Sequence, residues 1–133
     1  MTVIVTDAGF GPETWTAGFD SETTLDLLSD SDPATLATQI AGKEMIRIDF
    51  PSFADGRGFT LARQLRLMGY TGRLRAKGHV LADQYAMARR CGFDEVEISA
   101  ELAARQPQEQ WLARAQWSAH NYQARLRGSS AAR

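Results

Sequence analysis

The chain has 133 residues, of which 44% are hydrophobic and 23% are charged, and its formal net charge is −1. This length allows one globular domain with a hydrophobic core and is too short for two. No apolar run reaches the roughly 20 residues of a membrane-spanning helix, and a pI of ≈ 6.1 excludes a typical basic nucleic-acid-binding domain. The start lacks a basic leader followed by a long apolar run, so we expect a cytoplasmic protein.

The first third of the chain has the fewest structural signals. Residues 2–6 (TVIVT) are rich in β-branched side chains and predict a strand. Residues 7–31 hold several glycines and scattered aromatic residues, which indicates an irregular or hairpin-like segment with a strand near residues 25–28. Asp32 and Pro33 then suit the start of a helix that Gly42 closes.

The middle of the chain has the pattern of a βαβαβ unit. Apolar alternation and glycine boundaries predict strands over residues 44–50, 73–77 and 94–98, and amphipathic helices over residues 58–68 and 80–91. In the first of these strands, residues 45, 47 and 49 share one face and residues 46, 48 and 50 share the other.

The C-terminal part is predicted to be helical. Ser99 caps a short helix, and Pro107 begins a last helix that runs to about Arg127. One face of that last helix carries Trp111, Ala115, Ser118 and Tyr122. These aromatic residues suit either core packing or a partner or homodimer surface.

We therefore predict an α/β fold in a single domain over residues 1–128, followed by a flexible tail over residues 129–133. Its sheet is expected to be small and mostly parallel, built from consecutive βα units, with a C-terminal helix beside it. Right-handed crossovers leave two arrangements open, an open sheet and an incomplete barrel-like arc.

Ligands of parallel α/β folds bind beyond the carboxyl ends of the strands, which directs attention to the residues at those ends. The cluster predicted there consists of Asp49, Ser52, Asp55, Arg57, Lys77, His79 and Glu97, with Asp83 one turn into the following helix. Of these, Asp55 and Asp83 are the candidates for an acid–base group.

The glycine-rich loop Asp55-Gly56-Arg57-Gly58 is the best candidate for anion binding. Gly56 and Gly58 let the backbone approach a ligand, the next helix offers free N–H groups, and Arg57 and Lys77 add positive charge. The pattern matches no nucleotide-binding motif. In the simpler alternative, Asp55 caps the helix and the glycines only permit a tight turn.

Other kinds of site have little support. Cys91 is the only cysteine, so an internal disulfide and a multi-cysteine metal site are excluded, and we expect a small buried side chain. His79 suits a structural role or proton transfer, and the carboxylates have no metal-binding spacing. We predict no metal site, and no cofactor is evident.

The charge is unevenly distributed along the chain. Residues 1–50 carry a net charge of −7, residues 51–92 a net charge of +6, and residues 93–133 are balanced. The basic middle suits an anionic ligand or an acidic partner surface. Equally, the acidic first part could pack beside it.

Two runs in the middle resemble a bacterial family known as domain of unknown function 934. They are PSFADGRGFTLARQLR and GYTGRLRAKGHVLADQYAMARRCGFDEVEI, and the resemblance covers residues 32–98 and reaches residues 118–123. The matching positions are Phe50, Pro51, Phe53, Asp55, Gly56, Arg57, Gly58, Arg75, Ala76, Gly78, Val80, Asp83, Gln84, Arg90, Cys91, Gly92, Phe93 and Asp94. His79 stands where such proteins often have Asp, and residues 1–31 do not match.

The family is commonly labelled a probable oxidoreductase involved in sulfite reduction. The resemblance implies an accessory protein of assimilatory sulfite or sulfate reduction, with sulfite reductase, its electron donor or an anionic small molecule as the partner. The chain has no cysteine pair and no flavin, nicotinamide or haem motif, so we expect it not to reduce sulfite alone. Two alternatives stay open: a small enzyme acting on a phosphorylated or sulfated substrate, and a structural dimer without catalysis.

Overall fold

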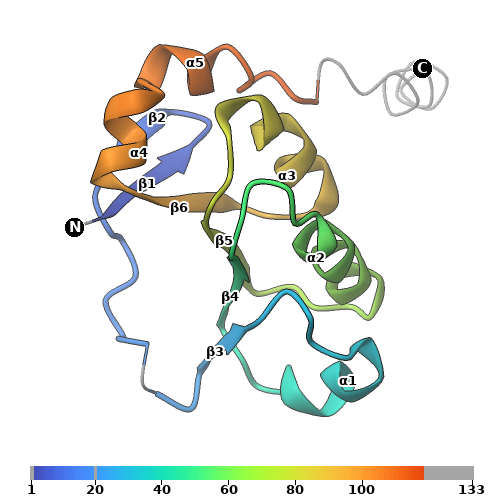
Figure 1. Cartoon of the computed structure of the whole chain (residues 1–133). Helices are drawn as coiled ribbons and strands as arrows, with labels where there is room; N and C mark the ends of the chain where they lie inside the picture. Colours follow the sequence, from blue (N-terminus) through green and yellow to red (C-terminus); the bar gives the residue numbers. More distant parts are fainter. Residues whose placement is uncertain (1, 20, 119–133) are drawn as a thin grey trace, which may run out of the picture.

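A six-stranded sheet forms the centre of the protein (Figure 1). The structure is a computed structural model that describes residues 2–19 and 21–118. The strands are β1 (Thr2–Thr6), β2 (Gly9–Gly11), β3 (Thr24–Leu27), β4 (Met45–Phe50), β5 (Arg73–Gly78) and β6 (Glu95–Ser99). Their order in the sheet is β2-β1-β6-β5-β4-β3.

The sheet is mixed, so the prediction of a mostly parallel sheet is wrong. Strands β3 to β6 pair in parallel, as the βαβαβ pattern predicts, but β1 pairs antiparallel with both β2 and β6. The connection from Thr6 to Gly9 is too short for a crossover, and a strand pair joined by so tight a turn must be antiparallel. Gly9 in this turn has a φ of 105°, a backbone conformation that residues with a side chain rarely adopt.

The helical segments agree with the predicted ones except at the C-terminus. They are η1 (Pro33–Thr35), α1 (Leu36–Gln39), α2 (Arg57–Leu67), η2 (Ala82–Gln84), α3 (Tyr85–Cys91), α4 (Ala100–Arg105) and α5 (Gln108–Leu112), where η marks a 3-10 turn. The predicted capping residues are confirmed: Asp32 Oδ1 accepts the Ala34 N–H at 2.9 Å, and Ser99 Oγ accepts the Leu102 N–H at 3.1 Å.

The last helix is shorter than its aromatic spacing predicts. Helix α5 ends at Leu112, and the N–H groups of Arg114 and Ala115 donate to carbonyls three residues back, at 2.9 and 3.1 Å. That pattern belongs to turns rather than to a continuing α-helix. The predicted continuation from residue 119, with Tyr122 and the tail 129–133, lies outside the described residues.

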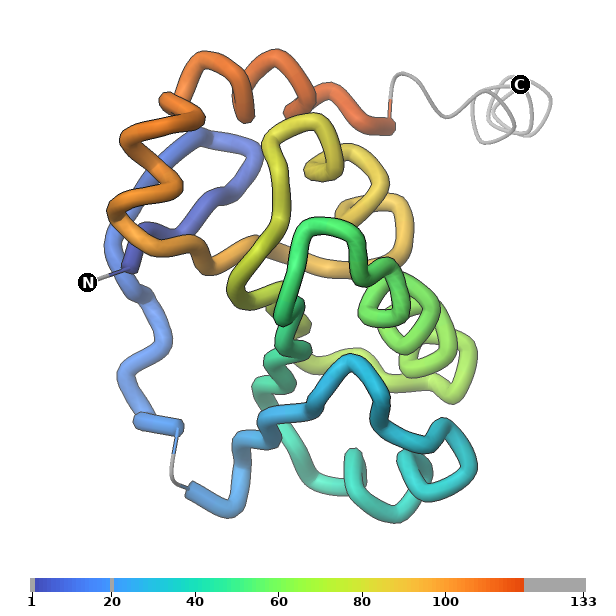
Figure 2. The backbone as a smooth tube through the Cα atoms, in the orientation of Figure 1, coloured from blue at the N-terminus to red at the C-terminus, as the bar shows by residue number. Residues whose placement is uncertain are grey.

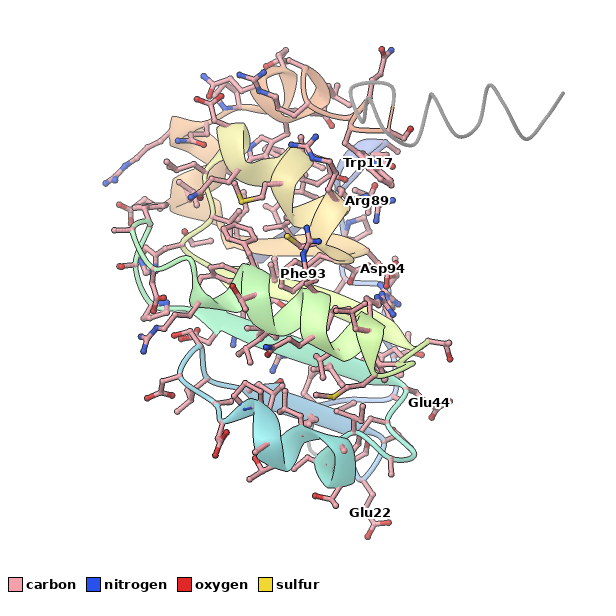
Figure 3. All side chains as sticks on the ribbon, turned by 90° about the vertical axis from the view of Figure 1, so that its right-hand side faces the viewer. Glu22, Glu44, Arg89, Phe93, Asp94 and Trp117 are labelled. Atoms are coloured by element: carbon pink, nitrogen blue, oxygen red, sulfur yellow. The ribbon has the colours of Figure 1, made fainter. Side chains whose placement is uncertain are left out.

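Helices α1, α2 and α3 lie on the same face of the sheet (Figure 1). Each step from β3 to β4, β5 and β6 moves one place in the same direction, so right-handed crossovers put every connecting helix on one side. The hydrophobic core lies between the sheet and these helices. It consists mainly of Ile46, Ile48, Phe50, Leu61, Leu65, Leu74, Ala76, Tyr85, Ala88, Val96 and Ile98. Figure 3 shows this helical side, with Arg89 stacked on Trp117 at 4.7 Å.

The opposite face of the sheet carries charged side chains. We call it the charged face and define it by Asp26, Arg47, Arg73, Arg75, Glu95 and Glu97, which are linked by ion pairs. Residues 12–19, here called the strap, run down this side without helix or strand and join the β1–β2 hairpin to β3 (Figures 1 and 2). Among the described residues, no helix is long and apolar enough to cross a membrane.

Candidate functional site

The carboxyl ends of the four parallel strands meet at one edge of the sheet. Strands β3, β4, β5 and β6 end at Leu27, Phe50, Gly78 and Ser99, as the βα pattern predicts. Three pockets open there: one on the charged face, one towards α4, and one of ≈ 310 Å³ between the loop after β3 and helix α2, where Arg57 lies. The residues of the predicted cluster therefore do not form one site; they lie in several places that differ in charge and in exposure.

The pocket on the charged face contains two of the predicted residues, Lys77 and Asp49. It measures ≈ 200 Å³, and we call it the Lys77 pocket; its lining residues are Asp26, Leu27, Leu28, Arg47, Asp49 and Lys77. Asp49 and Lys77 are paired in register on β4 and β5, so their side chains leave the same face of the sheet.

Lys77 and Asp49 differ from the other charged groups of this pocket because they have no ion-pair partner within residues 2–19 and 21–118. Arg47, by contrast, is held by Asp26 at 2.7 Å and by Glu97 at 3.3 Å. Lys77 and Asp49 are both half-buried residues, and their ammonium and carboxylate groups thus stay available to a ligand. This is the arrangement that can donate to one oxygen of a bound group and accept from another.

Asp55 is fully engaged by its neighbours. Its carboxylate accepts the Ser29 hydroxyl at 2.8 Å, the Arg57 backbone N–H at 3.1 Å, and the Arg57 guanidinium at 3.0 and 2.8 Å. The hydrogen bonds from Arg57, followed by the one from Ser29, hold the pKa of Asp55 well below its usual range. A carboxyl group so firmly ionised is poorly suited to acid–base work near neutral pH. Asp55 precedes the N-cap residue Gly56, and its bond to the Arg57 N–H satisfies the first free N–H group of α2.

Two glycines at or near this loop, Gly58 and Gly78, are required by close packing. A Cβ on Gly58 would overlap the ring of Phe50, which itself packs on Phe59 with ring centroids 4.9 Å apart. Gly78 has a φ of 115°, and a Cβ there would lie 2.8 Å from the Phe50 carbonyl oxygen. Gly56 is the N-cap residue of α2. Gly58 therefore permits the close approach of α2 to β4, and Gly78 that of β5 to β4, whereas Gly56 has room for a Cβ.

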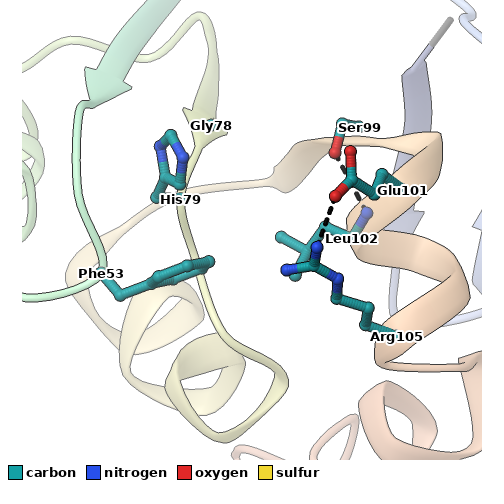
Figure 4. Close-up of a pocket in the computed structure, with 7 residues that line it drawn as sticks. All are labelled: Phe53, Gly78, His79, Ser99, Glu101, Leu102 and Arg105. Carbon is teal, nitrogen blue, oxygen red and sulfur yellow. Dashed lines mark hydrogen bonds and ion pairs between the residues drawn. The ribbon is translucent and has the colours of Figure 1, made fainter.

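His79 lines the second pocket, of ≈ 230 Å³ (Figure 4). Its Nδ1 lies 3.0 Å from the Phe50 carbonyl oxygen, which can only accept, so Nδ1 carries the proton and Nε2 is left for the pocket. Phe53 packs edge-on against the imidazole at 5.0 Å, and the ion pair of Glu101 with Arg105 forms the opposite wall. Of the predicted cluster, His79 alone is among the described residues that line this pocket.

The other predicted residues lie in different surroundings. Asp83 is 82% exposed and pairs with Arg114 at 2.9 Å beside α3, and no contact among the described residues joins it to Asp55. Ser52 is exposed in the loop after β4. Glu97 is buried in the charged face and binds Arg47 and Arg75.

Arg75 is the residue that the chemical reasoning from the sequence missed. Its side chain is 0% exposed and binds Glu13, Glu95 and Glu97. Burial alone would lower the pKa of Arg75, but the bonds to these carboxylates together raise that pKa above its ordinary value. Hydrogen bonds from Arg75 lower the pKa of Glu13 to about 2. The signal was present in RLRAK and DEVEI, where charged side chains recur at every second position of two neighbouring strands.

No group of three or more metal-ligating side chains is found among the described residues. Cys91 is buried in the core, as predicted for a small apolar side chain. A family model described as "Bacterial protein of unknown function (DUF934)" matches residues 24–132. No curated protein and no solved structure matches the chain significantly.

Proposed function

We propose that this chain, which belongs to the bacterial family of unknown function DUF934, is an accessory protein of assimilatory sulfite or sulfate reduction. It would act by binding a small anion, or an acidic group on a partner, at the Lys77 pocket. The partner would be sulfite reductase or its electron donor. The sulfur role comes from the family resemblance, and the choice of surface comes from the charges at the edge of the sheet.

The observation that carries the proposal is the available ammonium of Lys77 at the carboxyl ends of β4 and β5. Of the basic groups in its pocket, Arg47 already binds Asp26 and Glu97, whereas Lys77 has no carboxylate partner among the described residues. A charge-assisted bond from such a group to an oxyanion is stronger than a neutral one. The exposed side chain of Leu28 on the same pocket adds apolar surface for a partner.

Asp49 narrows the choice of anion. Its carboxylate faces the same pocket and would repel a ligand with no proton to offer. A ligand that keeps one proton, such as hydrogen sulfite or hydrogen phosphate, can accept from Lys77 and donate to Asp49. Sulfate, which is unprotonated near neutral pH, lacks that second bond.

The alternative of a small enzyme for a phosphorylated or sulfated substrate has one observation in its favour. Within the described part of the chain, Asp49 and Lys77 lie at paired positions and are not tied to other charges, so they could exchange a proton with a bound group. Under this alternative Asp49 and Lys77, rather than Asp55, would be the acid–base groups, because Ser29 and Arg57 hold Asp55 ionised.

Co-purification tests the sulfur role. We expect the full chain to retain sulfite reductase or its electron donor from an extract of a sulfate-grown source cell, and Lys77→Gln to retain clearly less. Arg63→Gln serves as the matched control, because Arg63 is an exposed base of α2 without an ion pair among the described residues. Failure of the native chain to retain either protein, together with unchanged sulfite-dependent growth of a deletion strain, would contradict the proposal.

A further inference from the structure

The guanidinium of Arg75 offers five N–H donors, and its buried position requires an acceptor for each. Nε donates to Glu95 at 2.6 Å, and Nη1 donates to Glu97 at 2.8 Å. The outer edge of the guanidinium binds Glu13 with both terminal nitrogens, Nη1 to Oε1 at 2.7 Å and Nη2 to Oε2 at 2.6 Å. Glu13 is therefore a bidentate ligand of that edge.

The sheet does not need Glu13 for charge balance. Its own strands place three arginines and three carboxylates on the charged face: Asp26, Arg47, Arg73, Arg75, Glu95 and Glu97. Glu13 is a fourth carboxylate, brought from outside the sheet. What it supplies is a pair of oxygen acceptors for two N–H groups that the strands leave without one.

The strap that carries Glu13 is only lightly attached. Within the described residues, no backbone hydrogen bond joins residues 12–19 to the sheet. Its side-chain contacts with the charged face are made by Glu13 on Arg75, by Thr14 on Arg73, and by Phe19, whose ring lies 3.7 Å from the guanidinium of Arg47 and 5.6 Å from that of Arg75. Most residues of the strap are exposed to solvent. The family model, moreover, matches residues from 24 onwards, so it includes Arg75 and excludes Glu13.

We infer that the outer edge of Arg75 is an anion-binding site that Glu13 occupies as an internal ligand. Its external ligand would be an anion with two oxygens placed to meet the two N–H groups, either a carboxylate or a tetrahedral oxyanion. Such a ligand displaces Glu13, and the strap lifts from the charged face. This site is distinct from the Lys77 pocket and goes beyond the proposed function.

Removal of the internal ligand tests the inference. Acetate and sulfate, which represent the two ligand classes, are titrated into the full-length protein while the NMR signal of the Arg75 Nε–H group is followed. We expect Glu13→Ala to bind at least one of them about ten-fold more tightly than the native chain, because an occupied site lowers apparent affinity by the fraction that is open. Phe19→Ala keeps Glu13 but loosens the strap, and should strengthen binding by about two-fold or more.

Two further variants distinguish binding at Arg75 from a general effect of charge and from binding at the Lys77 pocket. Glu22→Ala removes an exposed carboxylate near the strap and should bind as the native chain does. Adding Lys77→Gln to Glu13→Ala should keep most of the gain seen at the Arg75 Nε–H signal, with only a modest loss from the missing positive charge two residues along β5. The inference is overturned if Glu13→Ala binds neither anion more tightly, if it fails to fold, or if Lys77→Gln abolishes the gain. The last result would assign the anion to the Lys77 pocket instead.

Discussion

Replacing Arg75 with methionine is expected to lower the free energy of unfolding by about 3–5 kcal/mol, the range for breaking a buried ion pair from one side. The substitution leaves Glu95 and Glu97, whose side chains are 6% exposed, without their central partner. Arg73 still binds Glu95 and Arg47 still binds Glu97, so the lower end of the range is the better estimate. Urea unfolding followed by circular dichroism measures the change.

The Arg75 prediction has a control and a rescue. Arg63→Met removes an exposed arginine from α2 and should change the stability by no more than about 0.5 kcal/mol. Adding Glu95→Gln and Glu97→Gln to Arg75→Met removes the stranded charges and should recover part of the loss. A loss below about 1 kcal/mol for Arg75→Met would show that the charged face is more hydrated than its burial indicates.

Truncating Trp111 to alanine should cost a similar amount, about 3–5 kcal/mol, because it empties a large buried volume. The indole is 1% exposed, donates from Nε1 to the Gln106 carbonyl at 2.9 Å, and meets the Tyr85 ring edge-on at 6.0 Å. Thermal and urea unfolding measure the loss. Leu112→Ala is the matched control. Leu112 is the next residue of α5 and is 39% exposed, so its truncation should lower the free energy of unfolding by less than about 1 kcal/mol.

Trp111 also bears on the proposal of a homodimer. The side chain is used within the chain, where it holds α5 against Tyr85 of α3, so an aromatic dimer interface would have to use other residues. If Trp111→Ala left the stability unchanged but altered the mass in solution, the intrachain role would be contradicted.

Local periodicity was sufficient to predict the parallel part of the fold. Alternation in residues 44–50 and 94–98 and the amphipathic stretch at residues 58–68 led to strands and a helix within one or two residues of those observed. The antiparallel edge was not predictable in the same way. It depends on Gly9 in a tight turn and on the pairing of β1 with β6, which lies more than ninety residues away in the chain.

The sequence predicted which site residues lie together only where two neighbouring strands of the sheet carry them. The rule of strand carboxyl ends put Asp49 and Lys77 together, and β4 and β5 do pair there. It also grouped Asp83 with Asp55, yet the side chain of Asp83 lies beside Arg114. The bond between Glu13 and Arg75 joins residues 62 positions apart through an irregular strap, and no local pattern encodes such a contact.

Titration with sulfite, phosphate and sulfate tests the central claim, binding of an anion at the Lys77 pocket, most directly. Calorimetry on the full-length protein near neutral pH should show sulfite or phosphate binding more tightly than sulfate. Lys77→Gln should weaken that binding by about ten-fold, the loss of one charge-assisted hydrogen bond, and Asp49→Asn should reduce the preference over sulfate. Absence of binding to the native chain, or equal binding by native and Lys77→Gln chains, would contradict the account.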